Sequence, residues 1–204
     1  MPPALSRRAR LTAAALALIA FGSVGLRIAL SIEEMDGDVD AALWDLARFF
    51  TILTNTLVGL TFGLTALRKT GVYPPWIAAL TLSVVLVGAV YHLLLADLIT
   101  FTGLAVLADH GLHTLVPIGC LLWWLIFAPK RTLVYADLPI FAMWPALYVA
   151  YALGRGAQEG RYPYPFMNLA EIGAAAVATN LAGLMTVLLL GGIAMISLGS
   201  FADR

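Results

Sequence analysis

The chain has 204 residues, of which 61% are hydrophobic and 12% are charged, and its mean hydropathy is +0.91. Because a soluble domain is typically only about 45–50% apolar, these values exclude an ordinary soluble protein and indicate a membrane protein. Its 12 basic and 12 acidic residues balance, and no basic cluster with interleaved aromatic residues is present, so we expect no binding to nucleic acid. The single cysteine, Cys120, excludes an intramolecular disulfide and a cysteine metal site, and no cofactor is expected.

Hydrophobic stretches long enough to cross a bilayer, which takes about 20 residues, occur six times along the chain. They cover approximately residues 11–30, 45–67, 76–97, 109–127, 138–153 and 172–198, and the fifth is the shortest. The connections between them are brief. The sequence therefore predicts an all-α, polytopic membrane protein: one domain over residues 1–204 that forms a bundle of six transmembrane helices. The first stretch is longer than the hydrophobic part of a signal peptide, and no convincing cleavage site follows it, so we expect it to be retained.

Basic residues gather at the ends of the stretches that share one side of the membrane when six helices alternate in direction. These residues are Arg7, Arg8, Arg10, Arg68, Lys69, Lys130, Arg131 and Arg204, whereas the opposite loops carry only Arg155 and Arg161. Since basic residues are retained on the cytoplasmic side, both termini are predicted to be cytoplasmic. We expect a multi-pass protein of the cell membrane. The acidic outer loop, residues 33–40, lacks an EF-hand pattern, so we interpret it as solvated rather than calcium-binding.

Polar residues are informative inside the predicted spans because ionisable groups there are costly and usually functional. Arg48, Thr51 and Asn55 follow one another at spacings of three and four in the second stretch, which places them on one helix face. A threonine hydroxyl becomes a nucleophile when a base removes its proton. Thr51 is the candidate nucleophile, and Arg48 or Asn55 could donate hydrogen bonds to a developing oxyanion. The alternative is structural, because threonine in a helix commonly bonds a preceding carbonyl of its own helix.

The base for such a nucleophile is predicted at the start of the fourth stretch. The second and fourth stretches enter the membrane from the same side, and His113 lies at a depth similar to that of Thr51. Neutral imidazole is the base best suited to physiological pH. Asp109 lies four residues earlier on the same helix face and could orient the imidazole, as in a catalytic triad. His110 is another candidate partner.

Two other interpretations of these polar residues remain open. His92, His110 and His113 could supply three nitrogen ligands to a metal, but no HExxH pattern is present, and we predict no metal site. A non-enzymatic protein, either a small transporter or an accessory subunit, could instead use His113, Asp109 and Arg48 as a structural polar network. A transporter needs polar groups that continue through the membrane to its inner side. The inner halves of the predicted helices are almost wholly apolar, with Asn180 as an exception, which disfavours a proton path.

The chain also resembles a known family. Three segments carry the likeness: residues 48–55 (RFFTILTN), 109–117 (DHGLHTLVP) and 162–168 (YPYPFMN). In their order and in the six-helix layout, they resemble the six-span bacterial family written Pr-six-Pr, and this resemblance implies the bacterial inner membrane as the location. More distantly, they are similar to the eukaryotic androgen-induced and androgen-dependent TFPI-regulating proteins.

The resemblance implies a threonine hydrolase that cleaves fatty acid esters of hydroxy fatty acids, with a membrane lipid ester as substrate. Carried over by motif, the nucleophile falls on Thr51 and the base on His113. The position of Asp109 is similar to an asparagine in those relatives, and Thr54 stands where they have an acidic residue. Tyr164 and Pro165 belong to a proline-rich segment that we expect to be rigid and to form a lid or substrate mouth over the site.

Overall fold

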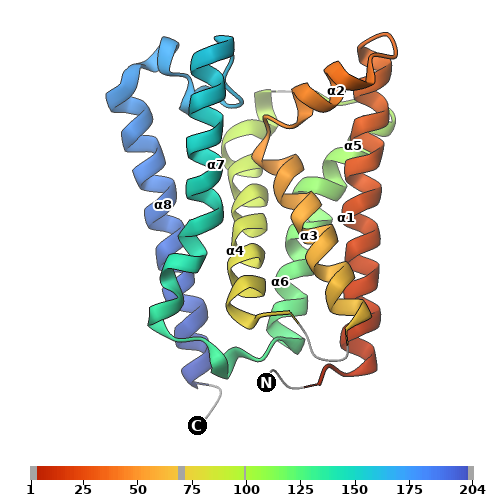
Figure 1. The fold of residues 1–204 in the computed structure, drawn as a ribbon, viewed down its shortest axis with the longest axis vertical. Helices are drawn as coiled ribbons and strands as arrows, with labels where there is room; N and C mark the ends of the chain where they lie inside the picture. The colour runs from red at the N-terminus through yellow and green to blue at the C-terminus, as the bar shows by residue number, and fades with distance from the viewer. Residues whose placement is uncertain (1–3, 69–71, 99, 202–204) are drawn as a thin grey trace.

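The computed structural model describes residues 4–68, 72–98 and 100–201, and this part of the chain folds as an all-α bundle (Figure 1). Six of its helical segments are long and apolar enough to cross a membrane. The prediction of an all-α bundle with six spans is therefore confirmed. The α-helices are α1 (Arg7–Glu34), α2 (Val39–Leu46), α3 (Phe50–Leu67), α4 (Pro74–Val90), α5 (Leu104–His110), α6 (Val116–Phe127), α7 (Leu138–Glu159) and α8 (Leu169–Phe201). Lys69 and Arg204, both used in the charge argument, lie outside the described residues.

The second predicted span, residues 45–67, is wrong at its start. The segment separates into α2 and α3, and the chain between them is extended at Phe49, with φ −90° and ψ 127°. Arg48 lies in this break and does not share a face of one helix with Thr51 and Asn55. The break contains no proline or glycine; instead, its carbonyl groups accept hydrogen bonds from tyrosines of α7, which hydrophobic periodicity cannot reveal.

The fifth span was also predicted too short, at residues 138–153. It continues to Glu159, and the shortest of the six spans is α3, with 18 residues. Hydropathy falls after Leu153, but Arg155 donates to the Glu159 carboxylate at 2.8 Å, and this pairing four residues apart favours the helix. The helix ends at Gly160, whose φ of 69° is a left-handed conformation that glycine adopts without strain.

Small residues allow α1 and α3 to approach closely in the core. Ala13, Ala17 and Ala20 of α1 are buried, at spacings that place them on one face. On α3, a Cβ added at Gly59 would lie 2.7 Å from the ring of Phe21. Lipid supplies little hydrophobic drive for helix association, so membrane helices depend on van der Waals packing. Larger residues at these positions would keep α1 and α3 apart and weaken that packing.

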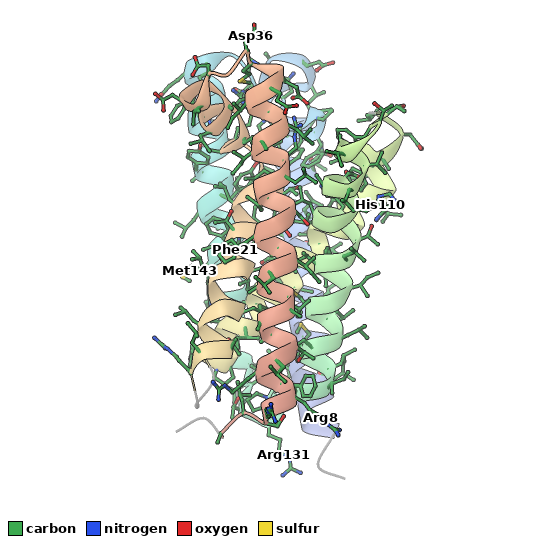
Figure 2. The ribbon with its side chains drawn as sticks, turned by 90° about the vertical axis from the view of Figure 1, so that its right-hand side faces the viewer. Arg8, Phe21, Asp36, His110, Arg131 and Met143 are labelled. Carbon is green, nitrogen blue, oxygen red and sulfur yellow. The ribbon has the colours of Figure 1, made fainter. Side chains whose placement is uncertain are left out.

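The ends of the bundle differ in charge. Figure 2 shows Arg8 and Arg131 at one end and Asp36 at the other. We call the end that carries Asp36 the acidic end. The beginning of α1 and the end of α8 lie at the opposite, basic end (Figure 1), as an even number of spans requires. Which end faces the cytoplasm stays a prediction.

Candidate functional site

The hydroxyl of Thr51 is not used by its own helix. Thr51 is the second residue of α3, so no helical carbonyl lies four residues before it, and the carbonyl of Ala47 accepts from the Tyr151 hydroxyl at 3.2 Å. One turn later, Thr56 makes the ordinary bond to the carbonyl four residues earlier, at 2.8 Å. The Thr51 Oγ1 atom instead lies 3.3 Å from Nε2 of His113. The break before α3 therefore leaves this hydroxyl available to a base.

His113 is held by two further side chains. Its Nδ1 atom lies 2.8 Å from Oδ1 of Asp109, which is buried. The other carboxylate oxygen of Asp109 accepts from the Tyr91 hydroxyl at 2.8 Å, and the Tyr91 ring stacks on the imidazole with centroids 3.8 Å apart. An acceptor at Nδ1 favours the tautomer with its proton on Nδ1, which leaves the Nε2 lone pair facing Thr51.

Both Tyr91 and His113 lie in π-helical turns: η1 (Tyr91–Leu95) follows α4, and η3 (Gly111–Leu115) connects α5 to α6. Pro117 explains the second turn, because it has no N–H to donate to the His113 carbonyl and its ring would crowd that carbonyl in an α-helix. The same carbonyl faces Gly88, where an added Cβ would lie only 2.8 Å away. The absence of a side chain at Gly88 thus lets α4 bring Tyr91 against His113.

A large cavity opens beside this cluster on the acidic end. Its volume is about 690 Å³, and Thr51, Asp109 and His113 line it together with Arg27 and Glu34. Arg27 pairs with Glu34 at 2.9 Å in a bidentate contact. We call this space the outer cavity. It gives the Thr51 hydroxyl and the imidazole access to a ligand with polar groups.

A second, smaller cavity meets Thr51 from another direction. Its volume is about 80 Å³, it lies among α4, α7 and α8, and none of the described residues that line it is charged. We call it the apolar slot. Thr51, Tyr91, Leu95 and Tyr164 line both spaces. Thr51 therefore lies at the junction of a polar cavity and an apolar one.

The predicted lid segment lies against the site. Tyr164 and Pro165 line the outer cavity, and the Tyr164 ring stacks on Phe166 with centroids 5.1 Å apart and packs edge-on against Phe49 at 6.1 Å. Burial raises the pKa of Tyr164, although hydrogen bonding to Thr51 opposes the shift. The phenol beside Thr51 is therefore neutral at physiological pH and able to donate a hydrogen bond.

Arg48 and Asn55, the two predicted oxyanion donors, bind partners other than the Thr51 hydroxyl. Arg48 is buried and pairs with Asp45 at 2.9 Å and Glu159 at 3.3 Å, so its guanidinium is engaged away from Thr51. The Asn55 amide donates to the carbonyls of Thr51 and Leu112, which ties α3 to η3. Both donors that were predicted for an oxyanion thus have other acceptors.

The histidines do not form a metal cluster. Among the described residues, no group of three His, Cys, Asp or Glu side chains could hold a metal ion. His110 lies on the outer surface (Figure 2), with its side chain 65% exposed and its Nδ1 3.7 Å from Asp109. His92 is exposed and hydrogen-bonds the Thr114 hydroxyl at 3.0 Å. Only His113 of the three faces Thr51.

Sequence reasoning missed Tyr91 and Gly88 as parts of the site. The sequence places Tyr91 at the outer end of its helix, but its partners lie on another helix, and no local pattern indicates them. Gly88, three residues earlier, was the one available signal, because a glycine inside a helix indicates a close approach of another segment. Comparison of the chain with family models, with curated proteins and with solved structures found no match.

Proposed function

We propose that this membrane-spanning protein is an intramembrane ester hydrolase in which Thr51 is the nucleophile and His113 the general base. The observation that carries the proposal is the continuous chain of contacts from the Thr51 hydroxyl through the imidazole to the Asp109 carboxylate. This is the arrangement of a nucleophile, a base and an orienting acid. It lies at a cavity that a substrate can enter.

Acylation uses the groups that are already in place. As the Thr51 hydroxyl attacks the ester carbonyl carbon, its proton passes to Nε2 of His113, and Asp109 stabilises the resulting imidazolium. The tetrahedral oxyanion needs a donor, and the neutral phenol of Tyr164 is the group we assign to it. The bond to the alcohol oxygen then breaks, and this oxygen takes the proton back from His113.

Deacylation repeats these steps with water. His113 removes a proton from water, which attacks the carbonyl of the threonine ester, and the departing Thr51 oxygen recovers a proton from the imidazolium. The products are an alcohol and a carboxylic acid. No metal or cofactor is needed for this balance.

A lipid carboxylic ester is the substrate class that fits the surroundings. The cluster lies within helices that are apolar enough to cross a membrane, and the apolar slot lies beside the nucleophile. The resemblance to the Pr-six-Pr family and the androgen-induced hydrolases supports the same Thr51 and His113 pair and the same substrate class. We propose the cell membrane, and the inner membrane of a bacterium, as the location.

Labelling of detergent-solubilised protein with a fluorescent fluorophosphonate tests this proposal. Wild type and Thr51→Ser should become labelled at position 51, whereas Thr51→Ala and His113→Ala should not. Thr56→Ala is the matched control, because its hydroxyl bonds its own helix one turn further along. If folded wild-type protein takes up no label, or if Thr51→Ala is labelled as strongly as wild type, the polar cluster is structural and the non-enzymatic alternative holds.

A further inference from the structure

The two cavities that meet at Thr51 have opposite chemistry. The slot is lined by side chains such as Leu86, Val90, Val149 and Leu188. Two of its tyrosine hydroxyls are already engaged: Tyr91 with Asp109, and Tyr148 with the carbonyl of Arg48. Away from Thr51 and Tyr164, a polar or charged group in this slot would lose its hydration without gaining partners.

The route of the proton determines which half of the ester lies on which side of Thr51. His113 must protonate the departing alcohol oxygen, so the alcohol half has to lie on the imidazole side of Thr51. His113 lines the outer cavity and not the slot. The acyl half stays bonded to Thr51 during the reaction and is free to extend the other way.

Building on the proposed hydrolase function, we propose that the apolar slot binds the acyl chain of the ester and that the outer cavity binds its alcohol half. Leu188 and Met185 of α8 set the acyl chain length. Along α8, the slot extends from Leu181 to Leu188, which at a rise of 1.5 Å per residue is about 10 Å. This length is close to that of an extended octanoyl chain, whereas a palmitoyl chain would extend past the residues that line the slot, so we expect acyl groups of medium length to be preferred.

The outer cavity accepts more varied groups. Its volume of about 690 Å³ far exceeds the roughly 80 Å³ of the slot, and its lining includes the charged residues Arg27 and Glu34, which can bind polar substituents. Selectivity for the alcohol half is therefore weaker than selectivity for the acyl half.

Two series of esters test this assignment on purified full-length protein. In the first, p-nitrophenyl butyrate, octanoate and palmitate vary the acyl half; in the second, octanoate esters of alcohols of increasing length vary the other half. Wild type should prefer octanoate over palmitate by about tenfold or more in kcat/KM, because each methylene that a pocket excludes changes the rate by a large factor. Leu188→Ala should shift this optimum toward palmitate, and Met185→Trp should shift it toward butyrate.

Two further variants serve as controls. Ala105→Trp narrows the outer cavity and should change only the alcohol series. Leu190 of α8 is 60% exposed, and Leu190→Ala should change the rates in neither series. Met185→Trp also keeps the test decisive if Leu188→Ala does not fold.

The outcomes separate this inference from the proposed function. Swapped responses, with slot variants changing the alcohol series and Ala105→Trp the acyl series, would overturn the assignment of the two halves. Unchanged acyl preferences in both slot variants, with Thr51 still labelled by fluorophosphonate, would overturn the slot as the acyl site while the hydrolase stands. An absence of both turnover and labelling would remove the hydrolase and this inference together.

Discussion

The ring of Tyr91 stacks on the imidazole of His113, with centroids 3.8 Å apart and planes only 10° apart. The same tyrosine donates its hydroxyl proton to Asp109, which also holds the imidazole. One residue therefore contacts both the imidazole ring and the carboxylate that holds it. A polar cluster with this much mutual support is expected to be rigid.

Tyr91→Phe and Tyr91→Ala separate the two contributions. Phenylalanine keeps the stack and loses a hydrogen bond to the carboxylate, so we expect hydrolysis to fall by about threefold to tenfold. Alanine also removes the stack, and we expect a loss of about a hundredfold. Steady-state kcat for an octanoate ester is the measurement. Tyr73→Phe, at an exposed tyrosine outside both cavities, is the control, and equal losses in the Tyr91 variants would contradict the stacking argument.

Replacement of Asp109 by asparagine should weaken His113 as the proposed base without displacing its imidazole. In Asp109→Asn, the amide oxygen can still accept from Nδ1 of His113, but a charge-assisted bond becomes a neutral one, so kcat should fall about tenfold to a hundredfold. Asp109→Leu leaves the imidazole without an acceptor and should cost considerably more. The ratio of the two variants is informative: if leucine were tolerated as well as asparagine, Asp109 would not orient His113. Asp40→Asn, at an exposed residue in the first turn of α2, controls for loss of one negative charge.

Gly88→Ala should damage the site from a distance. The added Cβ would lie 2.8 Å from the His113 carbonyl and 3.2 Å from the Pro117 ring, which forces α4 and η3 apart. We expect a loss of about 1–3 kcal/mol in the free energy of unfolding, together with slower labelling of Thr51. Gly183→Ala on α8, where a Cβ meets nothing within 4 Å, should be neutral or slightly stabilising. Thermal unfolding in detergent compares the two, and similar behaviour would rule out the close approach.

Arg48→Met should loosen the break that presents Thr51. Arg48 pairs with Asp45 and with Glu159 of α7, so its replacement leaves the α2–α3 connection bonded to α7 through the Tyr148 and Tyr151 hydroxyls without this ion pair. We expect a destabilisation of about 1–3 kcal/mol, typical of lost bonds to charged groups, and a lower labelling rate at Thr51. Arg161→Met changes an exposed arginine that contacts the same Asp45 at 3.6 Å and should shift stability by about 0.5 kcal/mol or less. An Arg48 variant as stable as the Arg161 variant would mean that the ion pair of Arg48 with Glu159 does not hold the break.

The predicted orientation is open to a direct test with single cysteines. Wild type should not react with a membrane-impermeant maleimide, because Cys120 is fully buried. Asp40→Cys at the acidic end should react in intact cells, and Tyr135→Cys near the basic end only after permeabilisation, since basic ends are retained in the cytoplasm. The reverse pattern would place both termini outside.

The sequence alone determined the number of spans and the general location of the polar residues. Apolar length sets the number of spans because lipid requires each crossing segment to satisfy its own backbone bonds. The fixed rise and turn of a helix placed Asp109 below His113, and the two indeed meet at 2.8 Å. These are local properties, so local patterns were sufficient.

Only the tertiary structure decided how the site is built. The break before Thr51 depends on hydroxyls of Tyr148 and Tyr151, which reach the carbonyls of Arg48 and Ala47 from about 100 residues away in the chain. The stack of Tyr91 on His113 depends on helices that meet through Gly88. Such contacts follow from which faces of separate helices pack together, and that choice is made by the whole bundle, because shape complementarity within a membrane is a property of pairs of helices and not of one segment.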